Sequence, residues 1–200
     1  SMPAEPATLR RSIACSGAIF VLLLAPGCGV DRDTLATPTR YNDPAIVPEE
    51  IALFFNQDFE AVEAGRPAEW VARKDREDKV SVVQDGAYSG KSALCIDQGP
   101  EWYFVSQAAS IDPGLVAGKV LTVTAMVKTE GAQLATVNLS LDGFYEFSSP
   151  RAPSNGRWNK VEVSCMVPAW WPGPKVTLSL NTGSAPAGPV LFDDVHVYVK

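Results

Sequence analysis

The chain has a single histidine, His196, so any catalytic proton relay or histidine metal site would depend on this one residue. It stands between two valines in an alternating segment, and no nucleophile motif accompanies it. The sequence has neither a glycine-rich phosphate loop nor the Cys and His spacing of a zinc site. Acidic residues are plentiful, but no spacing singles out a catalytic carboxylate pair. These patterns predict a protein that is not an enzyme.

The tryptophans are the other side chains of chemical interest, because an exposed indole ring can stack on a sugar or contact a protein or a lipid. Trp170 and Trp171 are adjacent and lie between Pro168 and Pro172. Neighbouring side chains of an extended segment point to opposite sides, so both cannot enter one core. We expect at least one of the two to meet solvent or a partner.

The elements that must position these residues are short strands. From Ile51 onward apolar and polar residues alternate, and turn residues recur about every ten positions. The alternation predicts strands over residues 80–83, 92–96, 102–107, 119–127, 135–141, 158–167, 176–181 and 190–199. No window shows a helical period. The pattern indicates an all-β fold, an antiparallel β-sandwich or jelly roll.

Two of these strands have a strictly alternating pattern. Their apolar residues should face the core: Val137, Leu139, Leu141, Val176, Leu178 and Leu180. The residues between them are small and polar: Asn138, Ser140, Thr177, Ser179 and Asn181. If the two strands share a sheet, its outer face suits hydroxyl-rich ligands, although any solvated sheet has the same composition.

Cys95 and Cys165 are the cysteines of this strand-rich region. Cys165 is in phase with apolar neighbours and should be buried, whereas Cys95 is out of phase with Leu94 and Ile96 and should face away from the core. An exported protein could oxidise them, but side chains on opposite faces cannot meet disulfide geometry. We expect free thiols.

The N-terminus has the pattern of a targeting segment. Arg10 and Arg11 precede an apolar stretch over residues 13–29, which predicts a signal peptide or membrane anchor over residues 1–28. The stretch ends in Gly27-Cys28, which resembles a bacterial lipobox and implies lipidation of Cys28. An uncleaved anchor and a cleaved soluble signal are the alternatives, and all three predict export to the periplasm or the cell surface.

Residues 29–50 are acidic, contain prolines and lack an apolar period, which predicts an extended linker, or else a chain lying along the domain surface. The domain itself should span residues 51–200. The chain of 200 residues has a net charge of −6 and no basic run. Because phosphate contacts need clustered Lys and Arg, nucleic acid is excluded as a partner.

Several motifs of residues 51–200 occur in an order that resembles a known family. They are Asn56-Gln57-Asp58-Phe59-Glu60, Glu69-Trp70, the segment 85–94, Ile111-Asp112-Pro113-Gly114, Gly156-Arg157-Trp158 and Phe192-Asp193-Asp194-Val195. This order is similar to that of carbohydrate-binding modules with a galactose-binding-like jelly roll. The resemblance implies that Trp70 and Trp158 are structural.

Members of this family often carry a structural calcium ion at one edge of the sandwich. The resemblance implies these ligands: Asp58, Glu60, carbonyls around Ser89 and Lys91, and Asp193 or Asp194. Asp193 has the phase of inward-facing valines, and a carboxylate at the rim of a core needs a cation or several donors. The alternative is that Asp193 accepts backbone N–H bonds and Asp194 is solvated.

Sugars in this family stack on aromatic rings of the concave sheet or the loop rim. The resemblance makes Trp102 the first candidate for ligand binding, followed by Tyr103, Tyr145, Trp170 and Trp171. The sequence thus predicts an exported, membrane-tethered, non-catalytic module that binds a polysaccharide. The alternative is a structural or adaptor subunit of a membrane or envelope complex, which would use the sandwich for protein contact.

Overall fold

The computed structural model describes residues 49–97, 99, 101–130, 134–142, 145–173, 175–183 and 188–200. All of these residues belong to one unit that spans residues 43–200. The predicted targeting segment 1–28, with Cys28, and residues 29–48 of the predicted linker lie outside the described residues. In the described part of the chain, no helix has the length and hydropathy needed to span a bilayer.

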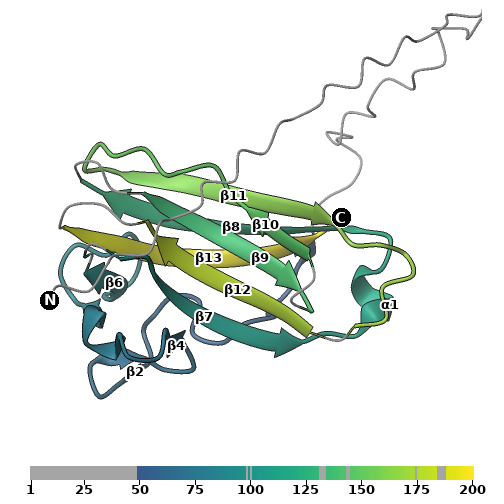
Figure 1. Ribbon diagram of the computed structural model, residues 1–200, viewed down its shortest axis with the longest axis horizontal. Coiled ribbons are helices and arrows are strands. Elements are labelled where there is room, and N and C mark those ends of the chain that lie inside the picture. Colours follow the sequence, from purple (N-terminus) through teal and green to yellow (C-terminus); the bar gives the residue numbers. More distant parts are fainter. Residues whose placement is uncertain are drawn as a thin grey trace, which may run out of the picture. The chain divides into compact units, whose positions relative to one another are not determined.

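Two antiparallel sheets pack face to face (Figure 1). The six-stranded sheet has the order β11 (Trp158–Met166), β8 (Val120–Thr129), β13 (Pro189–Val199), β6 (Ala93–Asp97) and β5 (Val80–Val83), and β1 (Glu49–Glu50) also pairs with β13. The five-stranded sheet has the order β10 (Tyr145–Ser148), β9 (Ala135–Leu141), β12 (Lys175–Thr182), β7 (Tyr103–Ser110) and β4 (Val71–Ala72). A hairpin of β2 (Val62–Glu63) and β3 (Arg66–Pro67) precedes β4. The predicted antiparallel β-sandwich is confirmed.

The alternation located every described strand of four or more residues except β10. The predicted strands 80–83 and 135–141 match β5 and β9 residue for residue. The alternation missed β10 and the two-residue strands β1 to β4, which are too short to show a period. The expected turn at Asp112 opens a single helical turn, α1 (Pro113–Val116), because the Asp112 carboxylate accepts the Gly114 N–H at 2.9 Å and caps it.

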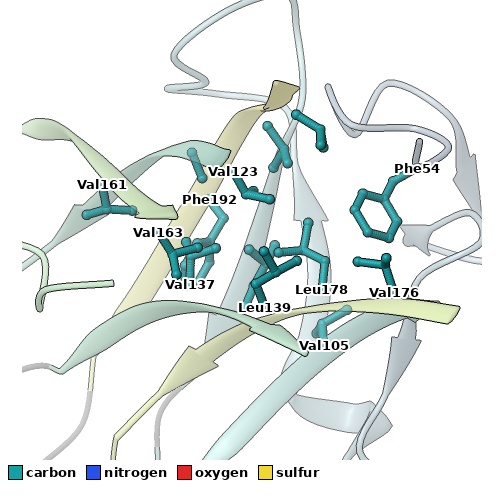
Figure 2. Close-up of a cluster of buried hydrophobic side chains, with 14 of the residues drawn as sticks. Phe54, Val105, Val123, Val137, Leu139, Val161, Val163, Val176, Leu178 and Phe192 are labelled. Atoms are coloured by element: carbon teal, nitrogen blue, oxygen red, sulfur yellow. The ribbon is translucent and has the colours of Figure 1, made fainter. Parts of the chain in front are cut away.

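The core lies between the sheets, where their inward side chains meet (Figure 2). Leu139 of β9 pairs in register with Leu178 of β12, and Val123 and Phe192 reach the same cluster from the other sheet. All six residues predicted to face the core from β9 and β12 are fully buried. Each such side chain contributes about 1.5–3 kcal/mol when it leaves water. The polar residues between them are thereby fixed on the outer face of the five-stranded sheet.

A bulge interrupts β13. The pairing with β8 shifts between Asp193 and His196, and Asp194 takes a left-handed backbone conformation with φ 51°. Because of the extra residue, Phe192 and Val195 are both buried although they are three positions apart. Gln57 stabilises the bulge with two hydrogen bonds. Its side-chain Nε2 donates to the carbonyl oxygen of Val195 at 2.6 Å, and its backbone carbonyl oxygen accepts the Val195 N–H at 3.1 Å.

Both cysteines in the described residues are free thiols, as predicted, and both are buried. Cys165 belongs to the main core cluster and Cys95 does not, so they lie on different faces. Cys95 faces away from the main core, as predicted, and it is nevertheless buried. It pairs across β5 and β13 with Ser81 and Leu191, and the outer face of the sheet is covered there.

Candidate functional site

Small polar side chains cover the outer face of the five-stranded sheet. In its central strand, Ser179 lies between Ser106 of β7 and Asn138 of β9. On either side of this row the register places Thr177 between Ala108 and Ser140, and Asn181 between Phe104 and Thr136. This face therefore offers hydroxyl and amide groups at the regular spacing of paired strands, about 4.8 Å apart.

Two aromatic rings stand at one corner of this polar face. Trp102 is 47% exposed, and its ring centroid lies 5.1 Å from that of Phe104 at a tilt of 43°. Tyr103 and Val105 alternate with them and are buried, so Trp102 and Phe104 share the outer side of the sheet. Phe104 was not predicted as a site residue, although the alternation around Trp102 would have placed it there.

A cluster of charged side chains positions Trp102. Arg73 Nη1 donates to the carbonyl oxygen of Trp102 at 2.8 Å, and Arg73 also lies 3.8 Å from the Glu101 carboxylate. Arg76 Nη2 lies 2.9 Å from the same carboxylate. The hydrogen bond from Arg76 lowers the pKa of Glu101, and the same bond raises the pKa of Arg76. Both groups thus stay charged, and the segment before β7 is held by contacts from the 73–76 loop.

Two asparagines on the polar face have unused acceptors. Asn138 donates through Nδ2 to Glu146 Oε1 at 2.9 Å, and Asn181 donates to the carbonyl oxygen of Ser179 at 3.3 Å. The Oδ1 atoms of both are buried and have no hydrogen-bond partner among the described residues. Buried acceptors of this kind are normally satisfied by a donor from water or a ligand. Asn138 and the neighbouring serines can accept hydroxyl protons, whereas Asn181 is only 2% exposed and lies out of reach of a ligand.

The structure separates the predicted ligand-binding aromatics. Tyr103 and Trp171 are each 4% exposed, and neither can present a ring face to a ligand. Trp170 is 68% exposed, so one tryptophan of the adjacent pair does meet solvent. Tyr145 begins β10, and only its backbone is described. We therefore keep Trp102 as the candidate and leave Tyr103 and Trp171 out of the site.

The residues predicted as calcium ligands make a different set of contacts. Glu60 Oε1 accepts the N–H groups of Lys91 and Ser92 at 2.5 and 2.9 Å. Asp193 Oδ2 accepts those of Tyr88 and Ser89 at 2.8 and 2.9 Å. The turn 88–92 thus directs amide donors toward these carboxylates, where a calcium ion would require oxygen acceptors.

The pKa values of the two carboxyl groups shift in opposite directions. The N–H groups of Lys91 and Ser92 lower the pKa of Glu60. Burial raises the pKa of Asp193, and its backbone hydrogen bonds only partly offset that rise. Asp58 accepts the Glu60 N–H at 3.4 Å, and Asp194 contacts His196. Among the described residues, no three His, Cys, Asp or Glu side chains come together as a metal site, and the donor set does not fit calcium.

His196 lies at the edge of a cleft of about 570 Å³ between β13 and the segment that follows β1. Its Nδ1 lies 2.5 Å from Glu50 Oε1, and its Nε2 lies 3.1 Å from Asp194 Oδ1. Burial lowers the pKa of His196, but the hydrogen bonds to the two carboxylates outweigh that effect and raise it. With both ring nitrogens engaged, this histidine joins two strands and has no free nitrogen to act as a base.

Comparison with solved structures places the domain among β-sandwiches that include carbohydrate-binding modules. The module TmCBM61 in complex with β-1,4-galactotriose has a TM-score of 0.58 and 18% identity, covering 74% of this chain and 98% of that chain. The CBM22-1 xylan-binding domain of Paenibacillus barcinonensis Xyn10C has a TM-score of 0.50 and 21% identity, covering 72% and 91%.

Other proteins with this fold have different activities. A cyclase from Fischerella sp. TAU has a TM-score of 0.62 and 12% identity, covering 77% of this chain and 98% of that chain. No family model and no curated protein matches the chain. At these identities the likeness shows the fold, a β-sandwich of the kind found in carbohydrate-binding modules, and the function must be argued from the site.

Proposed function

We propose that the domain is a non-catalytic carbohydrate-binding module, which an exported, membrane-tethered chain holds in the periplasm or at the cell surface. The observation that carries the proposal is the exposed Trp102 ring beside the polar outer face of the five-stranded sheet. A pyranose has an apolar face, which stacks on an indole ring, and hydroxyl edges, which need donors and acceptors within reach.

The polar face supplies those partners. Ser106, Ser179 and Asn138 form one row across the sheet, so a sugar chain stacked on Trp102 can extend over them. The two neighbouring modules are described with a β-1,4-galactotriose and as xylan-binding. We therefore choose β-1,4-galactan and xylan as the first ligands to test.

The test is affinity electrophoresis and calorimetry of the full chain with both polysaccharides, comparing Trp102→Ala with Trp170→Ala. Trp170 is the matched control because it is also exposed and precedes the Lys175 end of β12, whereas Trp102 adjoins the Thr182 end. Loss of a central aromatic anchor costs about 2 kcal/mol or more, which is about thirtyfold in Kd. We expect this loss for Trp102→Ala alone. Unchanged affinity in that variant, or no binding to any polysaccharide of an array, would overturn the proposal.

The alternative function, an adaptor subunit of an envelope complex, has a separate test. An adaptor would bind another envelope protein through exposed apolar side chains and would show no glycan binding. A pull-down from detergent-solubilised native membranes, run beside the polysaccharide array, distinguishes the two. Stoichiometric co-purification of a defined subunit without a glycan signal would favour the adaptor.

A further inference from the structure

We infer that the end of the sandwich formed by α1 and the loop after β11 docks on the lipid bilayer to which the chain is tethered. Three exposed apolar side chains lie at this end: Leu115, Met166 and Trp170, which are 56, 48 and 68% exposed. We call them the end patch. The inference rests on the proposed membrane tethering and adds a surface and an orientation to it.

Backbone hydrogen bonds bring the three segments of the end patch side by side. Gly118, just after α1, donates to the carbonyl oxygen of Val167 at 2.9 Å, and Val167 donates to that of Lys119 at 2.9 Å. Met166 pairs with Val120 at the start of β8. The loop that carries Trp170 therefore lies against the turn that carries Leu115, and Figure 1 shows α1 and this loop at the same end of the sandwich as the C-terminus.

The loop holds Trp170 outward. Trp171 is buried, and its backbone N–H donates to the carbonyl oxygen of Pro168 at 3.0 Å, which closes a tight turn. Proline at 168 and at 172 restricts the backbone on both sides. Because Trp171 anchors the turn, the ring of Trp170 is presented to solvent at a small further entropic cost. Tryptophan is the side chain most typical of the interface between lipid and water.

The tether enters the domain at this same end. Glu49, the first described residue, pairs with Val199. Lys200 in turn exchanges hydrogen bonds of 2.9 and 3.0 Å with Val120, the residue that pairs with Met166. The chain thus enters the sandwich at the same end as the end patch, with β13 and β8 between Glu49 and Met166.

The charges at this end permit the contact. Lys119, Lys175 and Lys200 lie at this end together with Glu49, Asp112 and Asp142, so these charges balance although the chain carries a net charge of −6. We therefore expect apolar burial to drive the contact and salt to affect it little. Three side chains bind a bilayer only weakly by themselves, but a tether supplies a high effective concentration.

Docking at this end agrees with a glycan site on the polar face. β7 begins directly after Trp102 and ends at Ser110, just before α1. Eight strand residues at about 3.3 Å each separate Trp102 from the end patch by roughly 25 Å. A domain that docks through the patch therefore presents Trp102 away from the lipid.

The test uses the full chain reconstituted into vesicles of phosphatidylethanolamine and phosphatidylglycerol with brominated acyl chains, which quench tryptophan fluorescence at short range. We expect quenching in the wild type, loss of most of it in Trp170→Phe, and no loss in the matched Trp102→Phe variant. Leu115→Ser, which keeps Trp170 and removes an exposed side chain, should reduce the quenching as well.

Each outcome decides a separate point. A chain that floats with the vesicles but shows no quenching dependent on Trp170 would overturn the docking and leave the tethering intact. A chain that does not float would overturn both, whereas glycan binding is measured independently in solution. A photo-crosslinking residue at position 170 that captures a defined protein and no lipid, in native membranes, would assign the end patch to a protein partner instead.

Discussion

Asp193 in the last long strand accepts the backbone N–H of Ser89 at 2.9 Å, although 104 residues separate the two in the chain. The same Oδ2 atom accepts the N–H of Tyr88, and Glu60 accepts those of Lys91 and Ser92. Two carboxylates thus fix one turn to β13 and to the segment before β2. Direct hydrogen bonds thus join the segments that the family resemblance expects a calcium ion to join.

Removing the buried carboxylate should destabilise the domain. Asp193→Ala leaves the partly buried N–H groups of Tyr88 and Ser89 without their acceptor, which costs about 1 kcal/mol for each group, near the lower end of the range for buried donors. Asp193→Asn should also destabilise, since an amide NH2 replaces one acceptor oxygen. Urea unfolding measures both, with Asp85→Asn on the exposed part of the same loop as the control. Equal stability of Asp193→Ala and Asp85→Asn would show that the Asp193 bonds contribute nothing.

Chelation should leave the domain intact. Because the turn 88–92 presents N–H donors to Glu60 and Asp193, we expect calorimetric melting at micromolar protein to give the same midpoint with and without EGTA. A midpoint that EGTA lowers and added calcium restores would instead establish the calcium site predicted from the family resemblance.

Gly90 is required by the same turn. Its φ is +58°, and a Cβ there would lie 2.2 Å from Glu60 Oε1. Gly90→Ala should therefore cost more than the roughly 1–2 kcal/mol of a left-handed alanine. Gly86→Ala is the matched control, because Gly86 also has a positive φ but open space around its Cα. Thermal melts of both variants isolate the contact with Glu60, and equal losses would argue against it.

The pairing of His196 with Glu50 and Asp194 should make stability depend on pH. Burial lowers the pKa of His196, but the bonds to the two carboxylates raise it above its value in the unfolded chain. Its stabilising contribution is therefore fully present below the unfolded pKa of about 6.5, and it is lost as the pH rises through the folded pKa. The difference in unfolding free energy between the wild type and His196→Gln should shrink as the pH is raised from 5.5 to 8.5. A difference that stays constant would contradict the ion pairs, and Glu50→Gln should weaken the trend.

The two buried thiols should resist alkylation in the native state. Burial raises the pKa of Cys95, and it raises the pKa of Cys165 to about 11, so little thiolate forms at pH 8. Iodoacetamide should label neither residue in the folded domain and both in urea without a reductant. Peptide mass spectrometry reads each site. Unlabelled cysteines in urea would reveal a disulfide.

The exposed ion pairs around Trp102 should affect the position of its ring but contribute little to the free energy of unfolding. Arg73→Gln removes the bond to the Trp102 carbonyl oxygen, and surface pairs of this kind contribute about 0–1 kcal/mol. We expect an unfolding midpoint close to that of the wild type but weaker glycan binding, since the loop that carries Trp102 loses its anchor. Calorimetric titration beside a melt measures the two effects, and a variant with unchanged affinity would show that Arg73 does not position the ring.

The sequence by itself determined the fold class and much of the core. Alternation is a local property of a strand, so residues such as Leu139 and Leu178 could be assigned to the interior before their partners were known. The same alternation predicted that Trp170 and Trp171 cannot both enter the core and that Cys95 and Cys165 lie on opposite faces. Phe104 could have been placed beside Trp102 by the same argument.

Only the tertiary structure decided what each assigned face meets. The polar face became a site because β12 pairs with both β7 and β9, which aligns Ser179 with Ser106 and Asn138. The burial of Cys95, the bulge at Asp194, the bonds from Asp193 to the turn 88–92 and the contact of the turn after α1 with the loop after β11 all depend on residues far apart in the chain. Such contacts depend on strand order and register, which cannot be read from the alternation within a single strand.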